Sequence, residues 1–277
     1  MNAVDICLAT YNGEKYIREF LISLHAQEFQ DFRILVSDDG STDDTLEILD
    51  EFRQQCNIVI IPNEKFKPLG PAKNFMYLLS RSTAPYVMLA DQDDVWHSEK
   101  IATCLNMMYD VEEKDSNIPV FVFSDYSEVD ENLNVRAISG LNNACKNVST
   151  TKVINDIEFT NYVPGCTAMI NRTLVQLSLI NVRYILMHDW WLMLLTKHNN
   201  GKFGFVELPL VLYRQHASNV IGIAPNSSPI MRALGFCRRP ITKFIRLLKQ
   251  FNMVTASGYR GTFLSFLLGK LKRVLSD

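Results

Sequence analysis

Residues 86–94 are Tyr-Val-Met-Leu-Ala-Asp-Gln-Asp-Asp, an apolar run that ends directly in three carboxylates. A short apolar run is typical of a buried β-strand, and the acids fall where that strand would leave the sheet. Other short apolar runs lie at residues 4–9, 32–37, 58–61 and 120–124. Apolar residues at helical spacing separate the first runs, at residues 16–24 and 42–52. This alternation predicts an α/β domain in which helices cover a mostly parallel sheet.

Three polar clusters each follow one of the predicted strands. They are Asn12-Gly13, residues 38–41 and residues 91–94. Ligands of open α/β sheets bind beyond the carboxyl ends of the strands. We therefore expect the three clusters to meet at one ligand site.

Charge divides the chain unevenly. The net charge is only -2, but residues 226–277 contain ten Lys or Arg and one acid, which leaves 18 bases and 29 acids in residues 1–225. Apolar residues in the basic part recur at helical spacing, with Phe244, Leu247, Leu248 and Phe251 on one face and Arg246 and Lys249 on the other. We predict a domain over 1–225 with a cation site, and a tail of basic amphipathic helices over 226–277.

Cysteine spacing and hydropathy bear on the compartment. The six cysteines are scattered without a Cys-x-x-Cys pair, which favours buried thiols in a reducing cytosol. The N-terminal residues lack the features of a secretory signal, and no apolar run approaches the ~18 residues that span a bilayer. We expect a cytoplasmic protein whose tail lies on the anionic inner face of the cell membrane. Packing of the tail on the domain or on a second subunit remains the alternative.

The carboxylates after two strands suggest a nucleotide and a metal. Oxygen ligands such as those of Asp91 and Asp93 suit Mg²⁺ or Mn²⁺, which also binds diphosphate oxygens. The alternative is an acidic turn that caps the following helix. Asp39 can accept hydrogen bonds from a base or a ribose, while Ser41 or Thr42 is expected to cap the helix that follows.

A third acidic position lies in an apolar segment. Residues 188–191, His-Asp-Trp-Trp, are flanked by apolar residues, and partial desolvation raises the proton affinity of a carboxylate such as Asp189. This setting suits a general base. The alternative is that Asp189 caps a buried helix whose Trp pair belongs to the core. Farther along, Arg214 and His216 follow an apolar strand and could approach a diphosphate or a metal.

Together these segments resemble the inverting glycosyltransferase family 2 of the GT-A fold, in particular its bacterial rhamnosyltransferase-like branch. The resemblance covers residues 4–222 and includes the motifs at 6–13, 36–43, 91–94, 188–189 and 213–222. It implies that the nucleotide is bound by Thr10, Tyr11, Asn12, Asp38, Asp39 and Asp91. It also implies a metal on Asp93, Asp91 and His216, and Asp189 as the catalytic base. The acceptor or the diphosphate would contact Gly165, Cys166, His188, Trp190 and Arg214. Ala9 departs from the Pro or Ser of many relatives, which affects base contacts rather than the chemistry.

The resemblance implies one reaction, an in-line displacement with inversion at the anomeric carbon. Mn²⁺ or Mg²⁺ would stabilise the departing nucleoside diphosphate while Asp189 deprotonates an acceptor hydroxyl. The branch favours dTDP-L-rhamnose as donor, with UDP-linked galactose, glucose or N-acetylhexosamine as the alternative. The acceptor would be a glycan or a lipid-linked glycan in cell-surface polysaccharide synthesis.

Rival functions explain fewer of these residues. A dehalogenase-type phosphatase would use Asp91-x-Asp93 but leaves Asp38, Asp39 and Asp189 without a role. A catalytically inactive nucleotide-binding module would keep the fold, although both the base and the metal positions are filled. An oxidoreductase lacks its Gly-x-Gly-x-x-Gly after the first strand. Nucleic-acid binding is not expected, because the domain is acidic.

Overall fold

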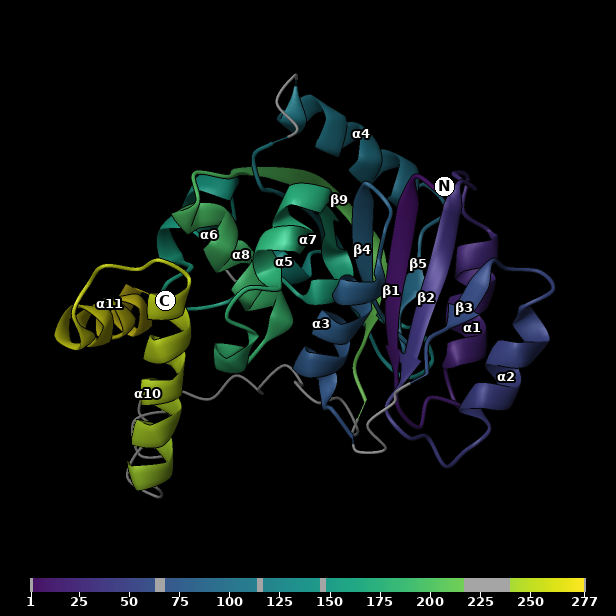
Figure 1. The fold of residues 1–277 in the computed structure, drawn as a ribbon, viewed down its shortest axis with the longest axis horizontal. Coiled ribbons are helices and arrows are strands. Elements are labelled where there is room, and N and C mark those ends of the chain that lie inside the picture. Colours follow the sequence, from purple (N-terminus) through teal and green to yellow (C-terminus); the bar gives the residue numbers. More distant parts are fainter. Residues whose placement is uncertain (1, 63–67, 114–116, 145–147, 217–239, 277) are drawn as a thin grey trace.

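The computed structural model describes residues 2–62, 68–113, 117–144, 148–216 and 240–276. In these residues one nine-stranded sheet has the order β3-β2-β1-β4-β8-β6-β9-β5, with β7 paired to β6 (Figure 1). The strands are β1 Val4–Thr10, β2 Phe32–Asp38, β3 Ile58–Ile60, β4 Tyr86–Asp91, β5 Val95–Trp96, β6 Val120–Val129, β7 Val135–Ala137, β8 Ala168–Asn171 and β9 Lys202–Arg214. All five strands predicted from the short apolar runs are present.

The first four strands, β1 to β4, pair with one another in parallel, as predicted. The later strands pair in both directions. β1 pairs in parallel with β2 and β4, β2 with β3, and β6 with β9. β8 enters antiparallel between β4 and β6, and β5 and β7 also pair antiparallel. The α/β fold is confirmed, and the carboxyl ends of β1, β2 and β4 lie side by side at one edge.

Helices cover the sheet. They are α1 Ile17–His25, α2 Thr45–Phe52, α3 Pro71–Arg81, α4 Lys100–Glu112, α5 Gly140–Ala144, α6 Thr150–Asp156, α7 Arg172–Ser178 and α8 His188–His198, with short 3-10 turns η1 Gly165–Thr167 and η2 Val182–Tyr184. α3 packs on β1 and β2 and contacts α7 and α8, whereas α4 packs on β6, β8 and β9. α8 thus carries the His-Asp-Trp-Trp segment of residues 188–191.

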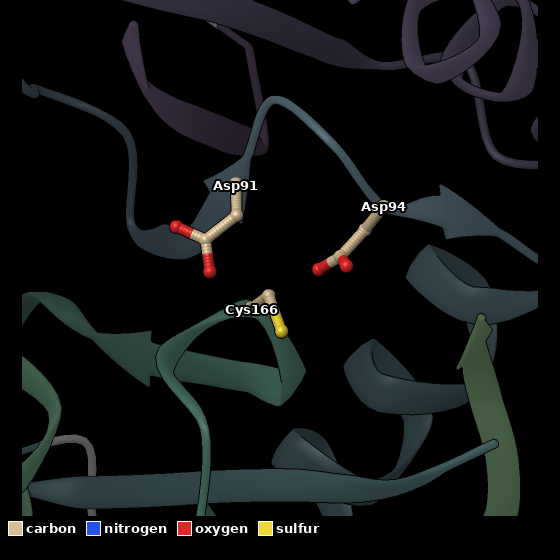
Figure 2. Close-up of side chains that lie close together, drawn as sticks. All are labelled: Asp91, Asp94 and Cys166. Carbon is tan, nitrogen blue, oxygen red and sulfur yellow. The ribbon is translucent and has the colours of Figure 1, made fainter. Parts of the chain in front are cut away.

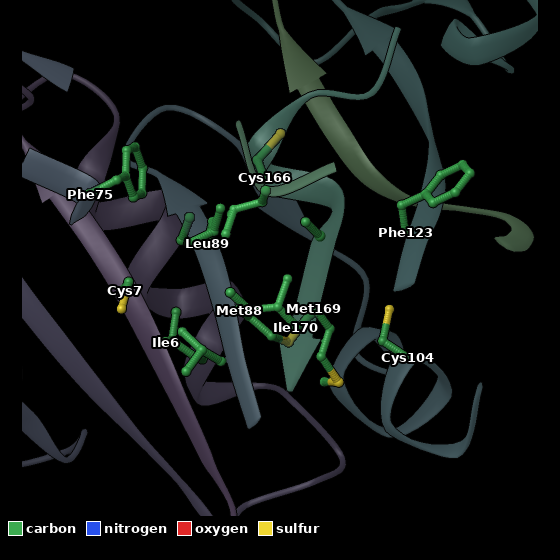
Figure 3. Close-up of a cluster of buried hydrophobic side chains, with 14 of the residues drawn as sticks. Ile6, Cys7, Phe75, Met88, Leu89, Cys104, Phe123, Cys166, Met169 and Ile170 are labelled. Atoms are coloured by element: carbon green, nitrogen blue, oxygen red, sulfur yellow. The ribbon is translucent and has the colours of Figure 1, made fainter. Parts of the chain in front are cut away.

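The core lies between the central strands and these helices. Figure 3 shows Ile6 of β1, Met88 of β4 and Ile170 of β8 between Phe75 of α3 and Cys104 of α4. Such burial of apolar side chains is the main favourable term in folding. Cys7, Cys56, Cys104 and Cys166 are buried and free, as expected, whereas Cys145 and Cys237 lie outside the described residues.

One local prediction was wrong. The helix after residue 41 begins at Thr45 with Asp44 at the N-cap, so neither Ser41 nor Thr42 caps it. Ser41 instead binds the loop after β1, because its hydroxyl accepts the Asn12 N–H at 2.8 Å.

Two C-terminal helices follow, α10 Pro240–Ala256 and α11 Phe263–Ser276. They lie at the end of the long axis opposite α1 and α2 (Figure 1). Met253, Val254 and Phe266 are buried, so the pair packs on the domain. Phe251 of α10 contacts Phe263 and Phe266 of α11, which holds the two helices together. Among the described residues, none of the helices is long and apolar enough to cross a bilayer.

Candidate active site

The loops after β1 and β2 are hydrogen-bonded to each other. Thr10 Oγ1 donates to Asp38 Oδ2 at 2.8 Å, and the Thr42 N–H donates to Asn12 Oδ1 at 2.9 Å. Asn12 has a φ of 45°, a left-handed conformation that Asn adopts more readily than most residues. The convergence of these two polar clusters is confirmed.

Asp38 and Asp39 point their carboxylates in different directions. Asp38 accepts the backbone N–H groups of Gly40 and Ser41, at 3.0 and 2.7 Å, and so shapes the turn itself. Asp39 is buried and accepts the N–H groups of Leu69 and Gly70, at 2.5 and 2.8 Å, just before α3. A carboxylate oxygen can accept a second hydrogen bond, so these contacts leave Asp39 able to accept one from a base.

Gln92 joins the third cluster to the first. Its amide accepts the Tyr11 N–H at 3.0 Å and donates to the Tyr11 carbonyl at 2.8 Å. Gly13 leaves room for this amide, because a Cβ there would lie 2.3 Å from Gln92 Oε1. The Tyr11 side chain remains 56% exposed, so its ring is free to stack on a base. Gln92 was not among the predicted site residues. In the sequence, only its place between Asp91 and Asp93 indicates that it belongs to the site.

Three carboxylates gather after β4. Figure 2 shows Asp91 and Asp94 with the Cys166 thiol between them, and ligand atoms of these three lie within 4.8 Å of one another. Burial, followed by the charges of Asp93 and Asp189, raises the pKa of Asp91 to about 7. Burial, Asp93 and Asp91 likewise raise the pKa of Asp94 well above its usual range. The carboxylates of the site therefore repel one another, and neighbouring protein groups do not fully neutralise their negative charge.

Asp93 faces His216, which lies two residues beyond the end of β9. Its Oδ2 lies 2.7 Å from His216 Nε2, and both side chains are largely buried. The His216 ring packs on Tyr16, with ring centroids 4.8 Å apart. The predicted approach of His216 to Asp93 is thus present, although residues 217–222 of the predicted motif lie outside the described residues.

Arg214 is buried and holds this loop together. Its backbone N–H donates to Asp94 Oδ1 at 3.2 Å, and its Nε donates to the Asp93 carbonyl at 2.8 Å. The other end of the guanidinium donates to the Glu131 carbonyl and to the Glu19 carboxylate, and it lies over the Tyr16 ring. These contacts make Arg214 a support for the acidic loop; its predicted contact with a diphosphate stays untested.

Asp189 lies in the first turn of α8, buried but close enough to Asp91 to raise its pKa. One of its oxygens accepts the Trp190 N–H at 2.6 Å. His188 stacks on Phe75, with ring centroids 3.9 Å apart, and burial lowers the pKa of His188. A Cβ on Gly165 would lie 2.6 Å from His188 Nε2, so glycine is required there. His188, Asp189 and Gly165 thus form one wall of the site.

Cys166 completes that wall and is tied to α4. Its carbonyl accepts a hydrogen bond from Lys100 Nζ at 2.8 Å, and the ammonium lies over the Trp96 ring. The thiol hydrogen-bonds to the Asp94 carboxyl group, and burial raises the pKa of Cys166 well above its usual value. A protonated thiol is a poor ligand for a hard cation, so the carboxylates and His216 are the groups that fit Mg²⁺ or Mn²⁺.

Trp190 is directed away from these residues. Its indole N–H donates to the Ile157 carbonyl at 2.6 Å, and Lys270 of α11 lies over its ring. The contact of Trp190 with the acceptor or the diphosphate stays a prediction. The structure brings the other candidates to one edge of the sheet.

These features define a class: GT-A domains, which bind a nucleotide beyond β1 and β2 and a diphosphate at an Asp-x-Asp after β4. The model of the family "Glycosyl transferase family 2" matches residues 5–176. The chain belongs to glycosyltransferase family 2 and is a glycosyltransferase that uses nucleotide sugars.

Relatives support the assignment over nearly the whole chain. The chain is 30% identical to the dTDP-rhamnosyl transferase RfbG of Shigella flexneri, over 98% of this chain and 96% of the relative. It superposes on S. aureus TarS 1–349, solved with UDP-GlcNAc, with a TM-score of 0.60 and 18% identity over 92% of this chain and 72% of TarS 1–349. A mannosyltransferase of Pyrobaculum calidifontis, solved with GDP-Man and Mn²⁺, matches with a TM-score of 0.54 and 16% identity over 99% of this chain and 74% of its own. The two structural likenesses bear on the fold alone.

Proposed function

We propose that the protein is an inverting, metal-dependent transferase that moves a sugar from a nucleoside-diphosphate sugar to a glycan or lipid-linked glycan in cell-surface polysaccharide synthesis. The observation that carries this proposal is the electrostatic contact between Asp189 of α8 and Asp91 of β4. It means that a candidate base lies within electrostatic range of a candidate diphosphate site.

The proposed chemistry needs one base. Asp189 takes the proton of an acceptor hydroxyl, whose oxygen forms the new bond to the anomeric carbon. The bond from that carbon to the diphosphate oxygen breaks, and the nucleoside diphosphate leaves with the electron pair. The position of Asp189 supports this role, because its buried carboxylate lies in the first turn of α8 and near Asp91.

Asp93, Asp91 and His216 are the residues that would hold the cation. Their support is the excess of carboxylates around Asp91, which a divalent ion would offset. When bound, Mg²⁺ or Mn²⁺ supplies Lewis-acid stabilisation of the negative charge on the departing diphosphate. Tyr11, Asp38 and Asp39 would bind the base and the ribose.

The donor is proposed to be dTDP-L-rhamnose. The support is the similarity to RfbG, which is named a dTDP-rhamnosyl transferase and matches nearly end to end. A UDP-linked hexose is the second candidate, since S. aureus TarS 1–349 was solved in complex with UDP-GlcNAc. A panel of donors scored for release of the nucleoside diphosphate separates the two.

We further propose that residues 1–225 form the catalytic domain and that the tail, residues 226–277, holds it to the inner face of the cell membrane. The support is the exposed apolar surface of α10 and α11, which includes Phe244, Ile245 and Leu268. Basic residues such as Arg246 and Lys249 are exposed on the same helices. An apolar face with basic neighbours suits an anionic lipid surface.

The central test is Asp189→Asn. We expect transfer to fall by ~10²-fold or more, the scale for loss of a general base, with unchanged binding of dTDP measured by calorimetry. Asp110→Asn, an exposed position on α4, is the matched control and should behave as wild type. Collapse of dTDP affinity in the Asp189→Asn variant would make Asp189 a binding or structural residue. Wild-type protein that binds nucleotide but releases none from any donor would support an inactive module.

A further inference from the structure

Helix α11 has two different faces. Phe266, Lys270 and Arg273 recur at i, i+4 and i+7 and face the domain, where Phe266 is fully buried and Arg273 nearly so. Leu264, Leu268 and Leu271 have the same spacing and are 57–66% exposed. The two rows differ by two positions, about 200° around a helix. We call the first row the inner face of α11.

The inner face of α11 contacts one short segment of the domain, residues 156–162. Lys270 Nζ donates to the Phe159 carbonyl at 2.7 Å, and the Phe159 ring fills the space where a Cβ on Gly269 would lie. Arg273 pairs with Asp156 at 3.1 Å and donates to the Tyr162 hydroxyl. Contacts of α11 with the domain thus concentrate on a loop that carries no proposed substrate contact of its own.

Helix α8 holds the same segment from its other side. The Trp190 indole donates to the Ile157 carbonyl at 2.6 Å, and Lys197 Nζ pairs with Glu158 at 2.6 Å. Trp190 follows the proposed base Asp189 directly. Residues 156–162 therefore link α11 to the turn of α8 that carries the base.

The segment also leads into the wall of the site. Three residues after Tyr162 the chain enters η1, where Gly165 meets the His188 ring and Cys166 meets Asp94. A shift of residues 156–162 would be passed on to Gly165 and Cys166 over this short distance. The acceptor side of the site is thus built on a segment that α11 anchors.

Lys270 contacts both the segment 156–162 and the first turn of α8. Its ammonium donates to the Phe159 carbonyl and lies 5.5 Å from the centroid of the Trp190 ring. Burial, followed by the nearby charge of Arg246, lowers the pKa of Lys270 to about 8. An ammonium in such surroundings is costly, and an apolar side chain of similar length would pack there at lower cost. Lys270 is thus a poor choice if its only task is to pack α11 on the domain.

We propose that Lys270 is a positioning residue for transfer to the acceptor: it fixes the distance between the first turn of α8, which carries Asp189, and the segment that leads to Gly165 and Cys166. This inference rests on the proposed function, since it assigns Asp189 and Gly165 to the acceptor side. It adds a residue of the C-terminal tail to the requirements of the reaction. A small displacement of a reacting group is enough to slow a reaction strongly.

The test is Lys270→Met, with Lys272→Met, an exposed position on the same helix, as the matched control. The probes are dTDP-L-rhamnose, or the donor the panel selects, and a synthetic N-acetylglucosaminyl diphosphate with an undecyl chain. We expect Lys270→Met to lower kcat for transfer or raise the acceptor KM by about 10-fold or more. The Kd for dTDP should stay within about twofold of wild type. Lys270→Arg keeps a positive charge and an N–H hydrogen-bond donor at this position. It should therefore restore most of the transfer activity that Lys270→Met loses.

Thermal stability separates positioning from packing. Because a partly buried ammonium is removed, Lys270→Met should melt at or above the wild-type temperature at pH 7 while its transfer is slower. A variant with wild-type transfer kinetics, or one whose lower rate accompanies a lower melting temperature and is not recovered by Arg, would overturn the proposal. If the wild-type protein shows no transfer with any donor, the proposed function fails instead.

Discussion

Asp93 differs from its neighbours Asp91 and Asp94, because its carboxylate has a basic partner at 2.7 Å, His216. Burial and mutual repulsion raise the pKa values of the other two. A divalent cation among these groups would remove part of that repulsion. At the scale of single residues, the unbalanced charge is the feature that most directly predicts a cofactor.

We therefore expect transfer to require a divalent cation. Exhaustive chelation should abolish it, addition of Mn²⁺ or Mg²⁺ should restore it, and Asp93→Ala should lower kcat by ~10²-fold or more, the scale for loss of one electrostatic group at a developing charge. Metal binding by calorimetry should weaken in the same variant. Asp50→Ala, exposed on α2, serves as the control. Full activity after chelation would rule out the metal role.

Single residues also show the limit of motifs. Asp39, Asp91 and Asp189 could be proposed from the sequence, because each follows a strand or opens a helix with a recognisable pattern. The hydrogen bonds of Arg214 to Asp93, Glu131 and Glu19 could not, since these partners lie 83 to 195 positions away in the chain. The hydrogen bond of the Trp190 indole to the Ile157 carbonyl could not be proposed from the motif either.

At the scale of elements, the amphipathic pattern of α11 could not distinguish residues that pack on the domain from residues that are available to a lipid surface. Its apolar residues were expected to form either a lipid-binding face or a packing face. Phe266 belongs to a packing face that is buried in the domain, whereas Leu264, Leu268 and Leu271 form a separate, exposed apolar row. Folding of the tail uses only the first face, so the second stays available for a lipid surface.

The leucine row predicts lipid binding by the full chain. Co-sedimentation with liposomes should rise with the fraction of anionic lipid and weaken with salt, because each basic residue near the surface contributes about 1 kcal/mol. Replacing Leu264, Leu268 and Leu271 by Ser should greatly reduce binding without slowing nucleotide release. The matched control replaces exposed apolar residues of the domain, Ile22, Val59 and Ile180, by Ser. Equal binding by both triple variants would favour the packed-extension alternative.

At the scale of the whole molecule, three separate segments of one sheet supply the proposed nucleotide site. Loops after β1, β2 and β4 are joined by the hydrogen bonds of Thr10 with Asp38 and of Gln92 with Tyr11. A ligand that binds these loops binds the folded chain only. Its binding free energy therefore adds to the stability of the whole domain.

We expect dTDP with Mn²⁺ to raise the melting temperature. At a concentration of 100 times Kd the gain is about 2.7 kcal/mol, which corresponds to several degrees for a protein of this size. Differential scanning fluorimetry should show a larger shift with dTDP than with UDP, and a smaller one in Asp39→Asn. A larger shift with UDP would instead favour the UDP-hexose donor. No shift with either nucleotide would contradict the proposed site.

The sequence by itself determined the strands β1 to β4 and β6, the first helices between them, and the polar clusters at the ends of β1, β2 and β4. These follow from local periodicity and from the parallel arrangement that puts carboxyl ends at one edge. Tertiary structure alone decided the antiparallel entry of β8, the support of the acidic loop by Arg214 and the link from Lys270 to Trp190. Each of these joins segments about 80 or more positions apart, and such contacts depend on how elements pack. Local patterns carry no signal for that packing, because many partners of similar shape and polarity satisfy the same pattern.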